Sequence, residues 1–263
     1  MSTGWRILIF FLAAACHSAS EKQTAGEPVP MPPLVSESKP VGQGREDAVS
    51  EEIQAPGQDV GALEKRLLAA GLVDVQAIIP EVRVDLKYAS TDNFFGKNVY
   101  GSLSRCYMQP EVADMLKIAY LELSDRYPEL TFLVYDAVRP QSVQQILWDE
   151  LDKPDSIKPL YVADPEKGSL HNFGVAVDLT LARKDNGEPL DMGTGYDYFG
   201  YPAYPDREEQ MLAQGKLRPE QVANRQILRD VMKKGGFTGI GSEWWHFNAY
   251  SRKVAGEKFD IVK

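Results

Sequence analysis

The chain has 263 residues, of which 43% are hydrophobic and 25% are charged, values typical of one globular domain with some additional chain. The formal net charge of -9 at pH 7 argues against a broad nucleic-acid surface, so no nucleic-acid partner is expected. An acidic balance of this size is sufficiently explained by solubility.

The first segment, residues 1–16, has the features of an export signal. Arg6 precedes the apolar run "ILIFFLAAA", which ends before Cys16 and is too short to span a bilayer as a helix. The letters "LAAAC" are similar to the lipobox of bacterial lipoproteins, although Ala13 stands where a larger apolar residue is usual. We therefore expect an exported lipoprotein, anchored to the membrane only through a lipid on Cys16 and facing the periplasm or cell exterior. A plain signal peptide and an uncleaved anchor are the alternatives.

A disordered tether is predicted over residues 17–60. This segment is rich in Pro, Gly, Ser and Glu and has almost no aromatic residues, so it cannot bury enough apolar surface to offset its ordering entropy. Residues 61–263 are long enough for one substantial core. Cys106 is the only cysteine in that part, which excludes an internal disulfide and favours a small buried residue over a nucleophile.

The remaining elements follow from hydrophobic periodicity and from proline and glycine at the ends of helices. In chain order we expect a helix over 61–72, a strand over 82–88, a helix over 109–127, a buried strand over 130–137, a helix over 140–152, a strand over 173–180, a helix over 218–236 and an extended segment over 242–250. Strands and helices do not alternate as regular βαβ units. The pattern therefore predicts an α+β fold with a mainly antiparallel sheet flanked by helices.

The two histidines of this region both lie near carboxylates. His171 is seven residues before Asp178 in "SLHNFGVAVDLT", which on one helix would separate them by about 10.5 Å along the axis. Donor atoms around one zinc ion lie only about 3–3.5 Å apart. Gly174 permits a bend after the histidine, and a following strand could then bring His171 back beside Asp178.

The second histidine, His246, follows Glu243 by three residues in "SEWWHF". On a regular strand the two side chains would face opposite ways, so a bulge or turn is needed if both serve one site. With His171 and Asp178, His246 would complete the three-ligand set of a catalytic zinc site, and Glu243 could act as the base. Each pair alone also occurs by chance, and Trp244 and its neighbour could simply be core. The commonest zinc-protease helix motif, a phosphate loop and a serine-hydrolase elbow are all missing from the sequence.

Several segments resemble, in the same order, the D-alanyl-D-alanine dipeptidases. This zinc peptidase family includes the vancomycin-resistance dipeptidases and is related to D,D-carboxypeptidases and the hedgehog fold. The matching segments are "VDLKYASTDNFFGKNVYG" (84–101), "YDAVRP" (135–140), "SLHNFGVAVDLT" (169–180), "MGTGYDYF" (192–199) and "EWWHF" (243–247). The resemblance covers nearly all of 62–263 and implies a hedgehog/D,D-peptidase-like fold.

The resemblance also implies roles for individual residues. His171, Asp178 and His246 match the ligands of one zinc ion per chain, and Glu243 matches the general base and acid. Arg139 matches the arginine that stabilises the tetrahedral oxyanion, a role in which a fixed cation lowers the barrier by several kcal/mol.

For the substrate, the resemblance implies that Asp197 and Tyr88 lie near the free ammonium group of a dipeptide and that Ser169 lies near its carboxylate. Two positions depart from the family pattern. Ala137–Val138 replaces the usual small-aromatic pair before the arginine, and Leu170 stands where a second small polar residue can occur. The pocket wall and the carboxylate contacts could therefore differ.

The function expected from the resemblance is zinc-dependent hydrolysis of the D-alanyl-D-alanine dipeptide by a metal-activated water, in cell-wall peptide metabolism. The small dipeptide is the only partner inferred, and no protein partner is expected. The nearer alternative is a zinc D,D-carboxypeptidase or L,D-peptidase that acts on longer wall peptides. The other is a non-catalytic metal-containing wall-binding module, against which Glu243 and Arg139 argue because a binder needs neither.

Overall fold

The computed structural model describes residues 60–263, except for the side chains of Val60 and Ala62. The export signal expected over 1–16 lies outside the described residues, as does the tether expected over 17–60 apart from its last residue. Both stay predictions. None of the helices formed by the described part of the chain is both long and apolar enough to cross a membrane.

A five-stranded sheet in the order β2-β4-β5-β7-β6 organises the described residues. Its strands are β2 (Arg83–Val84), β4 (Leu130–Asp136), β5 (Ala176–Arg183), β6 (Thr238–Gly239) and β7 (His246–Asn248). The pairing of β2 with β4 is parallel, whereas the other three pairings are antiparallel. A separate two-stranded antiparallel sheet joins β1 (Val73–Asp74) to β3 (Tyr107–Met108).

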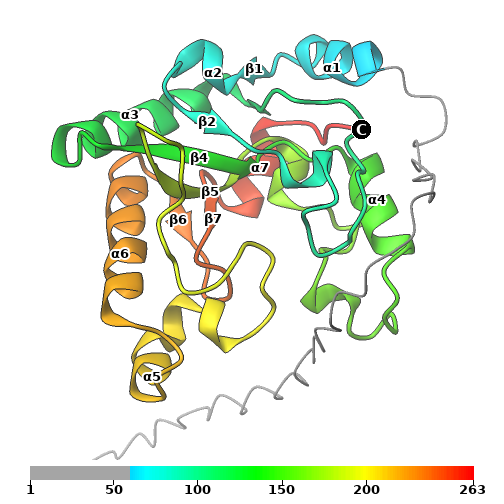
Figure 1. Ribbon diagram of the computed structural model, residues 1–263. Coiled ribbons are helices and arrows are strands. Elements are labelled where there is room, and N and C mark those ends of the chain that lie inside the picture. Colours follow the sequence, from blue (N-terminus) through cyan, green and yellow to red (C-terminus); the bar gives the residue numbers. More distant parts are fainter. Residues whose placement is uncertain (1–59) are drawn as a thin grey trace, which may run out of the picture. The chain divides into compact units, whose positions relative to one another are not determined.

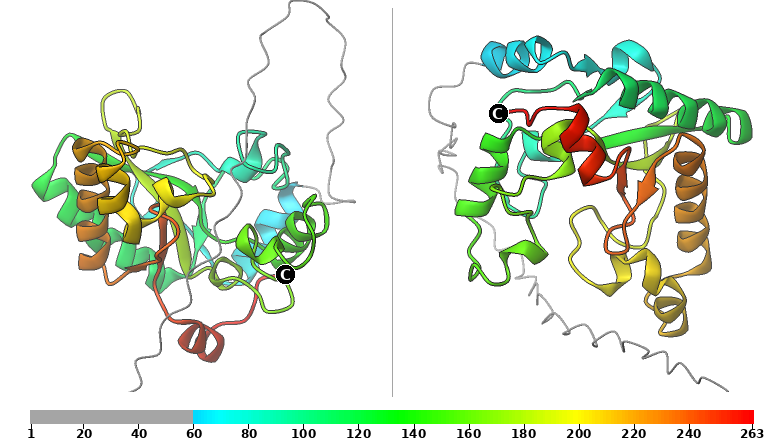
Figure 2. Two further views of the ribbon diagram at one scale, coloured as in Figure 1. Left: turned by 90° about the horizontal axis from the view of Figure 1, so that it is seen from below. Right: turned by 180° about the vertical axis from the view of Figure 1, so that it is seen from behind.

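Helices flank the sheet. They are α1 (Val60–Ala69), α2 (Val75–Ile78), α3 (Pro110–Arg126), α4 (Gln141–Asp149), α5 (Glu208–Ala213), α6 (Pro219–Lys234) and α7 (Arg252–Lys258). Short 3-10 turns are η1 (Lys87–Ala89), η2 (Lys158–Leu160), η3 (Leu170–Phe173), η4 (Tyr201–Ala203) and η5 (Pro205–Arg207). Helix α3 contacts α6 and β4, and Figures 1 and 2 show α4 across the sheet strands from these two helices. The expected α+β fold with a mainly antiparallel sheet is confirmed.

The two central strands, β4 and β5, form the middle of the core. All seven residues of β4 are buried, and so are the first seven of the eight residues of β5. Both strands are long apolar runs because both of their faces are covered. Each fully buried leucine in them, such as Leu179, stabilises the fold by about 1.5–3 kcal/mol. Asp136 and Asp178 interrupt these runs, and buried carboxylates need partners.

Most predicted elements are confirmed. The helices expected over 61–72, 109–127, 140–152 and 218–236 are α1, α3, α4 and α6. Helix α3 begins at Pro110, whose missing N–H costs nothing in the first turn. The buried strand is β4, whereas only residues 246–248 of the extended segment expected over 242–250 form a strand, β7, because the chain bends on both sides of it.

Two predicted strands are too long. The strand expected over 82–88 is limited to β2, because Lys87–Ala89 turns into η1 and buries Tyr88. The strand expected over 173–180 begins only at Ala176, because the preceding residues form η3. In both places a local turn with its own hydrogen bonds replaces the extended backbone that side-chain alternation favours.

Cys106 is 1% exposed and unpaired, in agreement with the prediction of a small buried residue. Burial raises the pKa of its thiol well above the ordinary value, with a smaller contribution from Asp136. At neutral pH Cys106 is therefore a protonated thiol, which is the unreactive form of the side chain.

Candidate metal centre and active site

Three residues of the candidate site lie in one row across the sheet. Asp178 on β5 is paired directly with His246 on β7 on one side and with Asp136 on β4 on the other. The register shifts between Val134 and Asp136, so the end of β4 is irregular where the row crosses it. The strand register thus places two carboxylates and one imidazole side by side.

The fourth residue, His171, comes from η3. The hydroxyl of Ser169 accepts a hydrogen bond from the His171 backbone N–H at 3.3 Å and caps this turn. Gly174 ends the turn at a φ of 67°, a left-handed conformation that glycine adopts without strain. The bend predicted after His171 is therefore confirmed, and it returns the chain along β5 to Asp178.

The C-terminal residues fasten this turn from outside. The backbone N–H of Val262 donates to the carbonyl of Asn172 at 2.8 Å, and the Val262 carbonyl accepts from the N–H of Gln141 at 2.8 Å. Asn172 also donates through its side chain to the carbonyl of Arg139 at 2.7 Å. Segments far apart in sequence therefore hold η3 against the start of α4.

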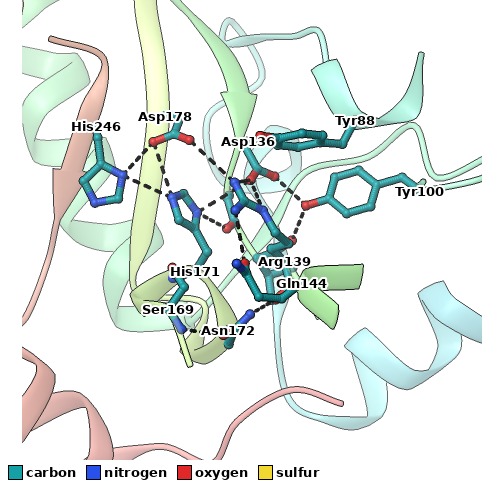
Figure 3. Close-up of polar contacts among 12 residues, drawn as sticks. Tyr88, Tyr100, Asp136, Arg139, Gln144, Ser169, His171, Asn172, Asp178 and His246 are labelled. Carbon is teal, nitrogen blue, oxygen red and sulfur yellow. Dashed lines mark hydrogen bonds and ion pairs between the residues drawn. The ribbon is translucent and has the colours of Figure 1, made fainter. Parts of the chain in front are cut away.

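Three ligand-type atoms converge at the centre of this arrangement (Figure 3). Oδ1 of Asp178 lies 2.9 Å from Nδ1 of His246 and 3.4 Å from Nε2 of His171. The two imidazole nitrogens are 3.2 Å apart. The side chains of Asp178 and His171 are each 4% exposed, and that of His246 is 12% exposed. The cluster can hold a metal ion, and its identification as the ligand set remains a prediction.

The outer atoms of the same three side chains have partners of their own. Nδ1 of His171 lies 2.6 Å from the carbonyl oxygen of Ala137, to which it can only donate. Nε2 of His246 lies 2.8 Å from the amide oxygen of Asn248. In neutral rings these contacts place each proton on the outer nitrogen, which leaves Nε2 of His171 and Nδ1 of His246 free to bind a metal ion. Without a metal ion His246 is held protonated, and its Nδ1 then donates to Oδ1 of Asp178 at 2.9 Å.

The electrostatics of the cluster favour positive charge. Burial alone would raise the pKa of Asp178, but the neighbouring His171 and His246 hold that pKa well below its ordinary value. Burial alone would lower the pKa of His246, yet the hydrogen bond and charge of Asp178 raise it to about 9. A buried carboxylate between two imidazoles thus attracts a cation.

Arg139 is a fixed cation next to this cluster (Figure 3). Its Nε and Nη2 donate to Oδ2 of Asp136 at 3.0 and 2.6 Å, and its Nη1 donates to the side-chain oxygen of Gln144 at 3.2 Å. Its guanidinium carbon lies 4.7 Å from the ring centre of Tyr88. Burial lowers the pKa of Arg139, but Asp136 outweighs this and raises it, so the guanidinium stays charged. Nη2 is 4.0 Å from Oδ2 of Asp178.

Glu243 lies in the bent segment that precedes β7. This bend allows Glu243 and His246 to face the same site, which a regular strand would not. Its Oε2 is 3.9 Å from Nδ1 of His246, and 32% of its side chain is exposed. Burial raises the pKa of Glu243 above its ordinary value, an effect that His246 opposes and Asp178 reinforces. The structure thus places Glu243 at the edge of the cluster of His171, Asp178 and His246, with part of its side chain in contact with solvent.

Asp197 and Tyr88, expected together near a substrate ammonium, are brought together. The hydroxyl of Tyr88 donates to Oδ2 of Asp197 at 3.3 Å. Asp197 is the only non-glycine residue among 60–263 with a positive φ, at 57°. Non-glycine residues in this strained backbone conformation cluster at functional sites. Burial raises the pKa of Asp197 well above its ordinary value, Arg139 opposes the shift, and Asp178 adds to it. This carboxylate is suited to a cationic partner.

The segment that carries Asp197 is tied to α6 by a buried arginine. Arg225 is 0% exposed and donates to the carbonyl of Met192 at 2.7 Å and to that of Pro202 at 2.8 Å. Both ends of the intervening loop are therefore fixed. Within the loop, the hydroxyl of Tyr196 donates to Oδ2 of Asp178 at 3.0 Å.

Four residues that contact the site were not predicted from the sequence: Asp136, Gln144, Tyr196 and Asn248. A signal existed for three of them. Asn248 is two residues after His246 on a strand, so it shares its face, whereas Asp136 and Tyr196 lie within the matched segments 135–140 and 192–199. Ser169, expected near the substrate carboxylate, is observed capping η3, and no feature of the structure tests the other role.

Comparison with known proteins gives one family. Residues 68–263, well over half of the chain, match the family model described as D-ala-D-ala dipeptidase. A D-alanyl-D-alanine dipeptidase of Escherichia coli (strain K12) is 39% identical over 178 residues, covering 67% of this chain and 83% of that protein. A D-alanyl-D-alanine dipeptidase of Enterococcus faecium is 30% identical over 209 residues, covering 73% of this chain and 97% of that protein.

Solved structures give weaker likenesses. An LD-carboxypeptidase, LdcB, has a TM-score of 0.36 and 21% identity, with coverage of 57% of this chain and 63% of that chain, less than two thirds of it. A mutant of the vancomycin-resistance D,D-pentapeptidase VanY, in complex with Zn(II), has a TM-score of 0.35 and 17% identity, with coverage of 59% and 79%.

Proposed function

Because the chain belongs to the D-ala-D-ala dipeptidase family of peptidases, we propose that it is a zinc-dependent enzyme that hydrolyses the dipeptide D-alanyl-D-alanine in cell-wall peptide metabolism. The observation that carries the proposal is the convergence of His171, Asp178 and His246 beside Glu243. Two imidazoles and one carboxylate with a nearby acid–base group suit metal-assisted hydrolysis.

The residues present fit a zinc ion. The three inner atoms are 2.9, 3.2 and 3.4 Å apart, close to the separation of about 3–3.5 Å between donors around one tetrahedral zinc. Three protein ligands would leave a fourth position for water or substrate. A bound zinc ion would lower the pKa of a water molecule and polarise the scissile carbonyl.

Glu243 is the proposed base and acid of the reaction. Its carboxylate, at 3.9 Å from the inner nitrogen of His246, can take a proton from the attacking water and return it to the leaving amine. Arg139 is proposed to stabilise the negative charge that develops on the carbonyl oxygen. Asp136 and Gln144 hold its guanidinium in place before the reaction, and such preorganised donors contribute about 2.7–4 kcal/mol.

Asp197 and Tyr88 are proposed to bind the free ammonium group of the substrate. The buried Asp197 carboxylate accepts hydrogen bonds from two neutral donors, the hydroxyl of Tyr88 and the backbone of Phe94, so a cationic ligand would stabilise its charged form. An acylated amine would leave Asp197 without this partner, so the site should reject peptides extended at the amino end. Ser169 is proposed to contact the substrate carboxylate.

A substrate panel tests the proposal. The zinc-loaded protein is assayed with D-Ala-D-Ala, its N-acetyl derivative, and a wall pentapeptide that ends in D-Ala-D-Ala. We expect cleavage of the free dipeptide, and rates on the two blocked substrates lower by a factor on the order of 10⁴, as for other sites with an unpaired buried polar group. Equal cleavage of the acetylated dipeptide would favour the carboxypeptidase alternative. No turnover of any substrate would favour the wall-binding module.

A further inference from the structure

The two oxygens of Asp178 have different surroundings. Oδ1 faces both inner imidazole nitrogens, at 2.9 and 3.4 Å. Oδ2 points away from them and accepts the hydroxyl hydrogen of Tyr196 at 3.0 Å. A carboxylate can bind a metal ion through one oxygen or through both. At Asp178 the second oxygen is already engaged by a protein donor.

The ring of Tyr196 is held firmly enough to direct that hydrogen bond. It packs edge-on against Trp245 with the ring centres 5.4 Å apart, and against Tyr88 at 6.3 Å. Tyr135 packs on it at 5.2 Å. The loop that carries Tyr196 is tied at both ends to Arg225. Little freedom remains for the hydroxyl to leave Oδ2.

We propose that Tyr196 is a positioning residue that restricts Asp178 to metal binding through Oδ1 alone. This inference rests on the zinc site of the proposed function. Binding through both oxygens would add a ligand atom and crowd the position that a catalytic site leaves for water and substrate. The hydrogen bond to Oδ2 keeps that position free and fixes the orientation of the Asp178 carboxylate.

The test removes only the hydroxyl, with Tyr196→Phe. The zinc affinity of the purified protein is measured by competition with a chromophoric chelator, and we expect a loss of about 10–100-fold, as is usual when an outer partner of a ligand is removed. In the cobalt-substituted protein, the visible bands should weaken and shift, because cobalt(II) absorbs less strongly when its coordination number rises. Tyr135→Phe is the matched control, since it removes a hydroxyl from the ring packed on Tyr196.

The proposal is overturned if Tyr196→Phe folds, binds zinc as tightly as the wild type and has the wild-type cobalt spectrum. A wild-type protein that binds no zinc would instead refute the proposed function. If Tyr196→Phe does not fold, fluorotyrosine is placed at position 196 or 135 of the otherwise wild-type chain. The fluorine resonance at 196 should then shift on zinc binding by more than that at 135, and equal shifts would also overturn the proposal.

Discussion

Asp178 and His246 are directly opposite each other on β5 and β7, and their side chains meet at 2.9 Å. The contact between them is therefore fixed by the backbone register of two hydrogen-bonded strands. A metal ion bound here would join these strands to the turn that carries His171. Metal binding and the stability of this part of the sheet should consequently be coupled.

Replacement of His246 should remove the metal. We expect about one zinc per wild-type chain, as for a site with three protein ligands, and a sharp fall in His246→Ala. A chelator should lower the unfolding temperature of the wild type but not that of the variant. His17→Ala, which changes the one histidine of the chain outside the proposed site, is the control. Full zinc content in a His171→Ala/His246→Ala double variant, measured by elemental analysis, would contradict the assignment.

Replacement of Glu243 should separate catalysis from metal binding. Glu243→Gln keeps the shape of the side chain but cannot accept a proton from water, so kcat should fall by about 10²- to 10⁴-fold. Zinc content and dipeptide binding, measured by calorimetry, should stay at wild-type values. Glu257→Gln, in an exposed ion pair with Lys253, serves as the control. A large loss of zinc in Glu243→Gln would mean that Glu243 is a ligand.

Asp197 should destabilise the metal-free protein as the pH rises. Because burial raises the pKa of Asp197 in the folded state, the folded chain holds more protons than the unfolded chain above about pH 4. Stability is then lost as the pH rises from the unfolded pKa through the folded one. In Asp197→Asn this loss should be smaller, and Asn tolerates the positive φ as well as Asp.

Denaturant unfolding of the chelator-treated proteins between about pH 4 and pH 8 measures this difference. The same variant should raise KM for the free dipeptide, because the ammonium group loses its charged partner. If Asp197→Asn were less stable than the wild type by the same amount at every pH, the carboxylate would not be the source of the effect.

Replacement of Cys16, which lies outside the described residues, tests the expected localisation. We propose that this residue carries a lipid and that the protein sediments with membranes on the extracytoplasmic side. Cys16→Ser should release the protein into the soluble exported fraction without a change in kcat. An unprocessed chain in the cytoplasm, detected by fractionation and intact mass, would refute the proposal.

The parts of the site that could be predicted are those that depend on local sequence. Gly174 indicated the bend. The alternation of side chains along β5 indicated that Asp178 and Val177 point to opposite faces of the sheet. The turn at Glu243 followed from its spacing to His246. Each of these inferences needs only the geometry of a few consecutive residues.

The contacts that could not be predicted join residues distant in sequence. The hydrogen bond from Tyr196 to Asp178 depends on the path of a loop whose ends are set by Arg225, thirty-three residues after Met192 in the chain. The shortening of β2 has a local origin instead. The side-chain amide of Asn93 donates to the carbonyl of Lys87, six residues earlier, at 2.9 Å and stabilises the turn, a contact that the alternation of side chains does not reveal.

The backbone hydrogen bonds of Val262 make the His171 turn sensitive to trimming of the chain. Exopeptidases that removed the residues after Ile261 would delete both bonds at once, freeing the carbonyl of Asn172 and the N–H of Gln141. The central strands would keep their own ladders, so a clipped preparation could retain its secondary structure while η3 loosened. Such material would look folded by circular dichroism and yet carry a mixture of intact and damaged centres, which intact-mass measurement would separate.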